Sequence, residues 1–224
     1  MSDKDMGMTN KQFQAFSSKA LKASNPDQGF VLSNLQKYER HYKREGLIQD
    51  YVQNAQRLAD IFEKKGKIDF AGIIYSALMK FKTLPFDIRE NLIKRGIEIA
   101  QMQKDAIHEL GRVVDLKILY HENIETRRKD YIKTLLSEEK LLKRIVREYE
   151  ICADGFKTVS KEMKPKDHYV CKLGLVKVDI AKQFINTNKK VALEKLKEAK
   201  KIFNNLKKYK EEFFAQGLIE QIKH

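Results

Sequence analysis

The histidines and cysteines are the side chains of this chain best suited to metal binding or nucleophilic chemistry. His121 and Glu125 are four residues apart and would share one face of a helix, but two ligands make an incomplete metal site. His168 and Cys171 are three residues apart, and a catalytic pair also needs a third group to orient the base. The spacing of Cys152 and Cys171 is not that of a zinc site. We therefore expect a solvated His–Glu pair, structural cysteines in a reduced chain, and neither a metal nor a cofactor.

Local sequence motifs of enzymes are missing as well. The chain contains no glycine-rich phosphate-binding loop, no paired-cysteine zinc motif and no G-x-S-x-G nucleophile motif. The sequence therefore predicts a protein that is not an enzyme.

Positive charge is the most prominent chemical feature. The 224 residues include 45 lysines and arginines against 31 acidic residues, which gives a net charge of +14. Such a charge attracts acidic proteins, nucleic acids or anionic membranes. On a helical wheel, four lysines of the C-terminal third share one side, opposite Leu196, Ala199 and Phe203; they are Lys190, Lys197, Lys201 and Lys208. This strip is either an ordinary solvated face or a binding surface for an acidic partner.

Composition indicates an all-α protein. The chain has 3 prolines and 10 glycines, 42% hydrophobic residues and 34% charged residues, a mixture typical of long amphipathic helices. No segment approaches the ~18 consecutive apolar residues of a membrane-spanning helix, and the first residues lack the apolar core of a signal peptide. We expect a cytoplasmic protein with no membrane span.

Two amphipathic helices around a short turn are clearest between Ala55 and Pro85. Apolar residues recur at helical spacing on both sides of the turn Lys64–Lys67, which predicts an antiparallel helical hairpin. Small residues, Ala59 and Ala71, occupy the positions where the two helix backbones must approach closely.

This hairpin resembles a tetratricopeptide (TPR) repeat. The repeat pattern W-x₂-L-G-x₂-Y, A-x₃-F, P is matched at six positions, although Ala55 replaces the tryptophan and the proline comes late; the matches are Leu58, Ala59, Phe62, Ala71, Tyr75 and Pro85. Fainter copies follow at Ala106, Leu110 and Val113 and at Ile180, Ala181 and Phe184. The resemblance implies an array of antiparallel helical hairpins, a TPR-like α-solenoid.

The expected organisation has four parts. They are a flexible leader over 1–9, N-terminal helices over 10–46, TPR-like hairpins over 47–205 and a C-terminal capping helix over 206–224. The sequence also predicts three local features. A capping box at Asp87–Glu90 opens a helix that pairs with a helix over 105–120. A loop spans 121–126. Separate helices cover 127–136 and 137–161.

By resemblance, the first helices of successive hairpins line a concave groove that binds a peptide or helix. Gln53, Asn54, Arg57 and Asp60 would line it in the clearest unit, and Asn54 and Arg57 offer an amide and a guanidinium suited to a carboxylate or an extended backbone. The sequence thus predicts a protein-interaction scaffold with an acidic partner.

Two other functions remain open. A basic helical-repeat protein could hold RNA or DNA by the phosphate backbone, although cations interleaved with exposed aromatic residues are not evident. A third possibility is self-association through the adjacent Phe213 and Phe214.

Overall fold

The computed structural model describes residues 3–23, 27–153 and 165–223, and every regular element within these ranges is an α-helix. The chain forms two compact units, Met1–Asp105 and Ala106–His224. The helices of the first unit are α1 (Asp3–Lys22), α2 (Gln28–Arg44), α3 (Ile48–Lys64), α4 (Ile68–Leu78) and α5 (Phe86–Met102). Those of the second are α6 (Ala106–Glu122), α7 (Ile124–Ala153), α8 (Pro165–Phe184), α9 (Lys189–Asn205) and α10 (Tyr209–Lys223).

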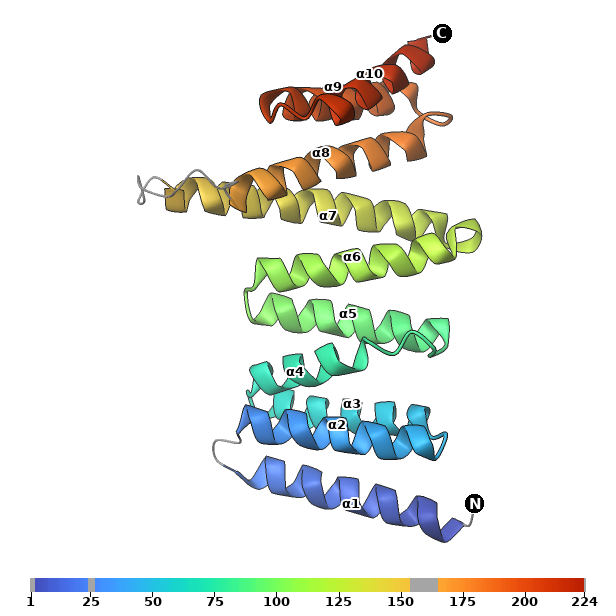
Figure 1. Ribbon diagram of the computed structural model, residues 1–224, viewed down its shortest axis with the longest axis vertical. Coiled ribbons are helices and arrows are strands. Elements are labelled where there is room, and N and C mark those ends of the chain that lie inside the picture. The colour runs from blue at the N-terminus through green and yellow to red at the C-terminus, as the bar shows by residue number, and fades with distance from the viewer. Residues whose placement is uncertain (1–2, 24–26, 154–164, 224) are drawn as a thin grey trace. The chain divides into compact units, whose positions relative to one another are not determined.

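Within each unit, consecutive helices pack side by side (Figure 1). α3 and α4 form the hairpin expected between Ala55 and Pro85, and α8 to α10 form further hairpins. The fold class predicted from sequence, an all-α, TPR-like array of antiparallel helical hairpins, is confirmed.

Helices of both units end in the same kind of turn. After α3, the amide of Gly66 donates to the carbonyl of Glu63 (2.8 Å) and the amide of Lys67 to the carbonyl of Phe62 (2.9 Å), a Schellman motif. Gly66 takes a φ of +71°, in the left-handed region that glycine adopts without strain. After α9, Lys207 occupies the same position with a φ of +55°. The motif turns the chain tightly, so that α4 packs antiparallel on α3 and α10 on α9.

Each unit has a core of its own. In the first, aromatic rings from α1, α2 and α3 contact one another edge to face, including those of Phe13, Tyr38, Tyr42 and Tyr51. The buried tyrosine hydroxyls have polar partners, as when Tyr51 donates to the carbonyl of Leu35 inside the core (3.1 Å). In the second, small and large side chains from α8, α9 and α10 interlock around Phe203.

The expected Asp87–Glu90 capping box is wrong. α5 begins at Phe86 with Pro85 as its N-cap residue and no side-chain cap. Asp87 therefore lies inside the first turn, where its charge favours the positive end of the helix dipole. Glu90 is buried and pairs with Lys94 four residues on (2.6 Å).

The expected pair of helices over 127–136 and 137–161 is instead the single helix α7, with non-helical angles at Arg127 near its start. Ser137 does not break the helix because its hydroxyl donates to the carbonyl of Lys133 (3.1 Å), four residues back. Residues 154–161 of the expected second helix lie outside the described residues. The loop expected over 121–126 shrinks to Asn123, because α6 continues through Glu122 and α7 starts at Ile124.

Two expected boundaries also differ in position. α1 begins at Asp3, so most of the segment expected as a leader, 1–9, lies in a helix. The expected hairpin of helices 88–102 and 105–120 spans the division between the units, since α5 packs on α4 and α6 packs on α7.

A substitution at Gly174 of α8 would test how closely α8 and α9 approach each other in the second unit. A Cβ atom at Gly174 would lie 2.6 Å from the fully buried ring of Phe203 on α9. Gly174→Ala should lower the free energy of unfolding by about 1–3 kcal/mol, because a ring enclosed in the core has no space to move into. Urea denaturation measures the change.

Gly111→Ala is the matched control, because an added Cβ on this exposed turn of α6 would meet no atom within 4 Å. We expect it to be neutral or to stabilise by up to about 1 kcal/mol. Equal stability of the two variants would contradict the close approach of α8 and α9.

Candidate partner-binding site

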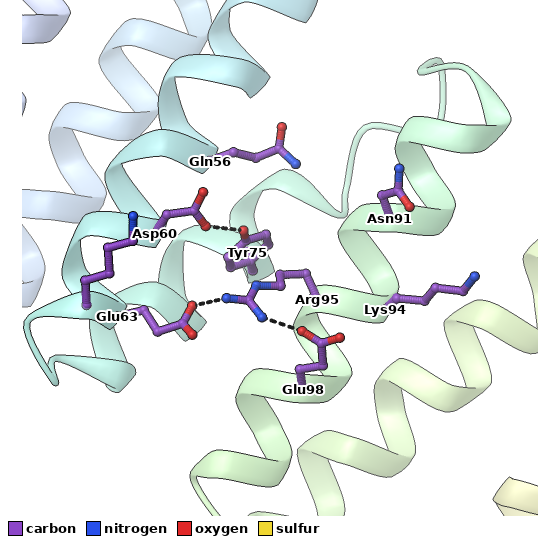
Figure 2. Close-up of a pocket in the computed structure, with 9 residues that line it drawn as sticks. Gln56, Asp60, Glu63, Tyr75, Asn91, Lys94, Arg95 and Glu98 are labelled. Atoms are coloured by element: carbon purple, nitrogen blue, oxygen red, sulfur yellow. Dashed lines mark hydrogen bonds and ion pairs between the residues drawn. The ribbon is translucent and has the colours of Figure 1, made fainter.

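A polar groove lies in the first unit, between α3 and α5, with α4 contributing Tyr75 between them (Figure 2). The cavity measures about 580 Å³. Its lining residues are Gln56, Asp60, Glu63 and Lys64 from α3, Tyr75 from α4, and Asn91, Lys94, Arg95 and Glu98 from α5. Gln56, Asp60 and Glu63 are spaced by one helical turn, so they project from one face of α3.

Arg95 holds the two sides of this groove together. Its guanidinium forms ion pairs with Glu63 of α3 and with Glu98, one turn further along α5 (Figure 2). Both pairs are charge-assisted hydrogen bonds, and the pKa of Arg95 is raised, first by Glu98 and then, against the effect of burial, by Glu63. Arg95 therefore links the two carboxylates across the groove, and the three groups together carry one net negative charge.

Tyr75 and Asp60 form a second polar contact inside the groove. The Tyr75 hydroxyl donates to Oδ1 of Asp60 at 3.0 Å. Burial, followed by the neighbouring Asp60 carboxylate, raises the pKa of Tyr75, so the phenol stays protonated. A protonated phenol that donates to a carboxylate is suited to fixing α4 against α3 and is a poor nucleophile.

The side chains that remain for a ligand are amides and lysines. Gln56 and Asn91 lie on opposite sides of the groove and each carries a donor and an acceptor (Figure 2). Lys64 and Lys94 are exposed, and Lys94 pairs with the buried Glu90 (2.6 Å).

Asn54 lies away from the groove, between α3 and the two preceding helices. Its amide donates to Oδ1 of Asn10 on α1 (2.9 Å) and to the hydroxyl of Tyr42 on α2 (3.1 Å). The Tyr42 hydroxyl itself donates to Oδ1 of Asn10 (2.6 Å). Asn54 thus ties α3 to α1 and α2.

Of the other α3 residues expected along the groove, Asp60 lines it, while Gln53 and Arg57 are exposed outside its lining. Arg57 lies one turn before Asp60, near the groove's edge on the helical wheel. Partner binding by Asn54 and Arg57 stays a prediction.

The lysine strip predicted in the C-terminal third lies on α9 and the turn after it. Lys190, Lys197 and Lys201 are exposed and Lys208 is half-buried. Glu194 is exposed on the same face, within one turn of both Lys190 and Lys197, and reduces the local charge. A binding role for these four lysines also stays a prediction.

A buried charge cluster in the second unit was not anticipated from the sequence. Glu139 of α7 is 4% exposed and accepts from Lys177 of α8 (2.8 Å) and from Lys195 of α9 (2.9 Å to each oxygen). Lys177 is 3% exposed and also pairs with Glu198, while Lys143 pairs with Glu139 at 2.9 Å. The cluster joins three helices, so we interpret it as structural.

The residues suited to metal or nucleophilic chemistry have ordinary packing contacts. The ring of His121 lies 5.5 Å from that of Tyr131, and His121 belongs to α6 whereas Glu125 belongs to α7. Cys171 is half-buried against the core of the second unit, and burial raises the pKa of its thiol. The side chain of Cys152 lies outside the described residues. Within the ranges that the structure describes, no three histidine, cysteine or acidic residues are grouped to hold a metal ion.

Among the described helices, none combines the length and apolar composition that crossing a membrane requires.

Comparisons with known proteins yield distant likenesses only. No protein-family model and no curated protein matches the chain. One similar solved structure is a circular tandem repeat protein with novel repeat topology and enhanced subunit contact surfaces, at 13% identity and a TM-score of 0.39. That match covers 94% of this chain, which spans 57% of the other protein's length.

A second similar structure is a Podosopora anserina putative kinesin light chain with nearly identical TPR-like repeats. It has 16% identity and a TM-score of 0.31 over 86% of this chain and 93% of that one. We base the TPR-like architecture on the hairpins described above.

Asn54→Ala should separate a positioning role from a binding role. The substitution removes two hydrogen bonds between helices, so we expect it to lower the free energy of unfolding by about 1–2 kcal/mol. Arg57→Ala, on the same helix but exposed, should change it by less than about 0.5 kcal/mol. Urea denaturation of both variants checks this, and an Asn54 variant as stable as the wild type would refute the structural assignment.

The buried cluster around Glu139 predicts that the difference in stability between the wild type and a Glu139→Gln variant depends on pH. Burial alone would raise the pKa of Glu139, but hydrogen bonds from Lys177, Lys195 and Lys143 outweigh it and lower the pKa from 4.5 to about 2. A carboxyl group with a depressed pKa stabilises the fold above its unfolded-state value, and this contribution is lost as the pH falls through the folded-state value. Glu139→Gln should therefore cost about 3 kcal/mol at pH 7.

The loss of stability in Glu139→Gln should shrink as the pH falls from about 4.5 toward 2, because protonation makes the wild-type side chain resemble glutamine. Denaturation at several pH values measures it. Glu194→Gln, at an exposed site, is the control and should stay within about 0.5 kcal/mol of the wild type throughout. A deficit that does not depend on pH would contradict the assignment.

Proposed function

We propose that this protein is a non-enzymatic interaction scaffold that binds an extended peptide of a partner protein in the groove between α3 and α5. The observation that carries the proposal is the chemistry of this groove. Its Glu63 and Glu98 carboxylates are ion-paired with Arg95 and its Asp60 carboxylate accepts from Tyr75, which leaves the Gln56 and Asn91 amides and the rim lysines for a ligand.

Amides on two facing helices suit a peptide backbone. A carboxamide can accept from a peptide N–H and donate to a peptide carbonyl at the same time. Because Gln56 and Asn91 lie on opposite sides of the groove, a single extended segment could contact both (Figure 2). Hydrogen bonds from these amides to backbone groups would fix the position of a peptide in the groove without selecting its side chains.

Lysines at the rim favour an acidic peptide. Lys64 and Lys94 are exposed. Together with Arg95 they equal in number the acidic lining residues Asp60, Glu63 and Glu98, so the lining has no net formal charge. Arg57, one turn before Asp60, would extend this positive edge.

Nucleic-acid binding through α9 is the second candidate. The exposure of Lys190, Lys197 and Lys201 favours it, since phosphate contacts need accessible cations. Glu194 within the strip reduces its charge, and Arg144, a potential second phosphate contact, is paired with Glu109 (2.7 Å). We therefore place peptide binding first.

A peptide selection tests the proposal. The full chain is presented to a library of random displayed peptides, and the enriched peptides are labelled and titrated by fluorescence anisotropy. Enriched peptides should be acidic. The double variant Gln56→Ala and Asn91→Ala should weaken their binding about tenfold or more, as expected for two lost hydrogen bonds.

Gln36→Ala, which removes an exposed amide from α2 outside the groove, is the control and should change the affinity less than about twofold. Equal binding by the double variant would refute the groove as the site. Failure to enrich peptides, with binding of an oligonucleotide that weakens steeply as salt rises, would favour the second candidate.

A further inference from the structure

The outer face of α10 carries aromatic side chains in solvent. Phe213 is 82% exposed, Tyr209 69% and Phe214 50%. The opposite face of the helix is ordinary, with Ala215, Ile219 and Ile222 buried in the core of the second unit. Phe213 is thus exposed because of its position on the helix, while the helix itself is firmly packed.

On the exposed face of α10, the ring of Phe213 projects next to Gly217, which has no side chain. Phe213 and Gly217 are one turn apart on the outer face, and nothing lies within 4 Å of the place where a Cβ atom of Gly217 would be. The glycine leaves a notch beside the projecting ring of Phe213. Phe214, whose ring is contacted by Lys182 of α8 at 5.1 Å, continues the apolar surface to one side.

We propose that α10 is a homodimer interface, in which the helices of two copies pack antiparallel about a two-fold axis. This inference is independent of the peptide groove. In an antiparallel pair centred at the level of Ala215, residues equally distant from position 215 lie opposite each other. Phe213 of each copy then fills the notch at Gly217 of the other, and the missing side chain lets the helices approach closely.

Charge complementarity supports the same register. Lys210 and Glu220 are also equally distant from position 215, and both are exposed on the outer face. The two-fold axis therefore places Lys210 of each copy opposite Glu220 of the other. A parallel arrangement would instead set Lys210 against Lys210, and a uniformly acidic ligand would meet Glu220, so a second copy of this chain fits the face best.

The dimer should be weak. α10 has 15 residues and is about 22 Å long, so one helix pair forms an interface at the small end of specific protein contacts. The net charge of +14 on each copy opposes association. We expect a dissociation constant on the order of 10–100 μM.

Sedimentation equilibrium of the full chain, from roughly 1 μM to 1 mM, tests the interface. The wild type should pass from monomer to dimer. Phe213→Ala should raise the dissociation constant about tenfold or more, with little effect on folding because this ring is 82% exposed. A monomer at all concentrations, or a Phe213→Ala variant that dimerises as well as the wild type, would overturn the proposal.

Charge reversal tests the antiparallel register separately. Lys210→Glu and Glu220→Lys should each weaken the dimer, because each sets like charges opposite each other. The double variant Lys210→Glu with Glu220→Lys should recover the wild-type dissociation constant within about threefold, since both pairs re-form with reversed sign. Failure of the double variant to recover would refute this register.

Discussion

Close approach of paired helices at small side chains is the constraint on which the rest of this structure depends. Ala59 of α3 and Ala71 of α4 are fully buried in the core of the first unit, and Gly174 of α8 lies against Phe203 in the second. A helix that packs this closely on its neighbour positions its other side chains accurately. In the first unit, that packing brings Tyr75 of α4 within hydrogen-bond distance of Asp60 and places both in the groove.

Ion pairs between helices add specificity to this packing. Arg95 joins α5 to α3 through Glu63, and Glu139 joins α7 to α8 and α9 through Lys177 and Lys195. Buried pairs contribute little net stability, because desolvation offsets much of their attraction, but losing one partner is costly. In the groove, Arg95 occupies the Glu63 and Glu98 carboxylates, so the proposed ligand contacts are the amides and the lysines.

The sequence predicted the elements well and the contacts between distant elements poorly. Apolar periodicity located the α3–α4 hairpin, and Gly66 marked its turn, because both signals are local. Asn54 was assigned to the groove because periodicity alone does not show that α1 covers that side of α3, where Asn10 meets it from 44 residues away. The pairing of Glu139 with Lys195, 56 residues apart, could not be predicted for the same reason. The predicted division between helices 127–136 and 137–161 was wrong, since α7 continues through Ser137.

Site-specific photo-crosslinking tests the central claim, that the groove between α3 and α5 holds the partner, most directly. A photoreactive amino acid is placed at position 91 in the groove or at position 36 on the exposed face of α2, and each protein is irradiated in the presence of an enriched peptide. The account predicts a covalent adduct from position 91 and none above background from position 36. Equal labelling from both positions, or labelling from position 36 alone, would contradict it.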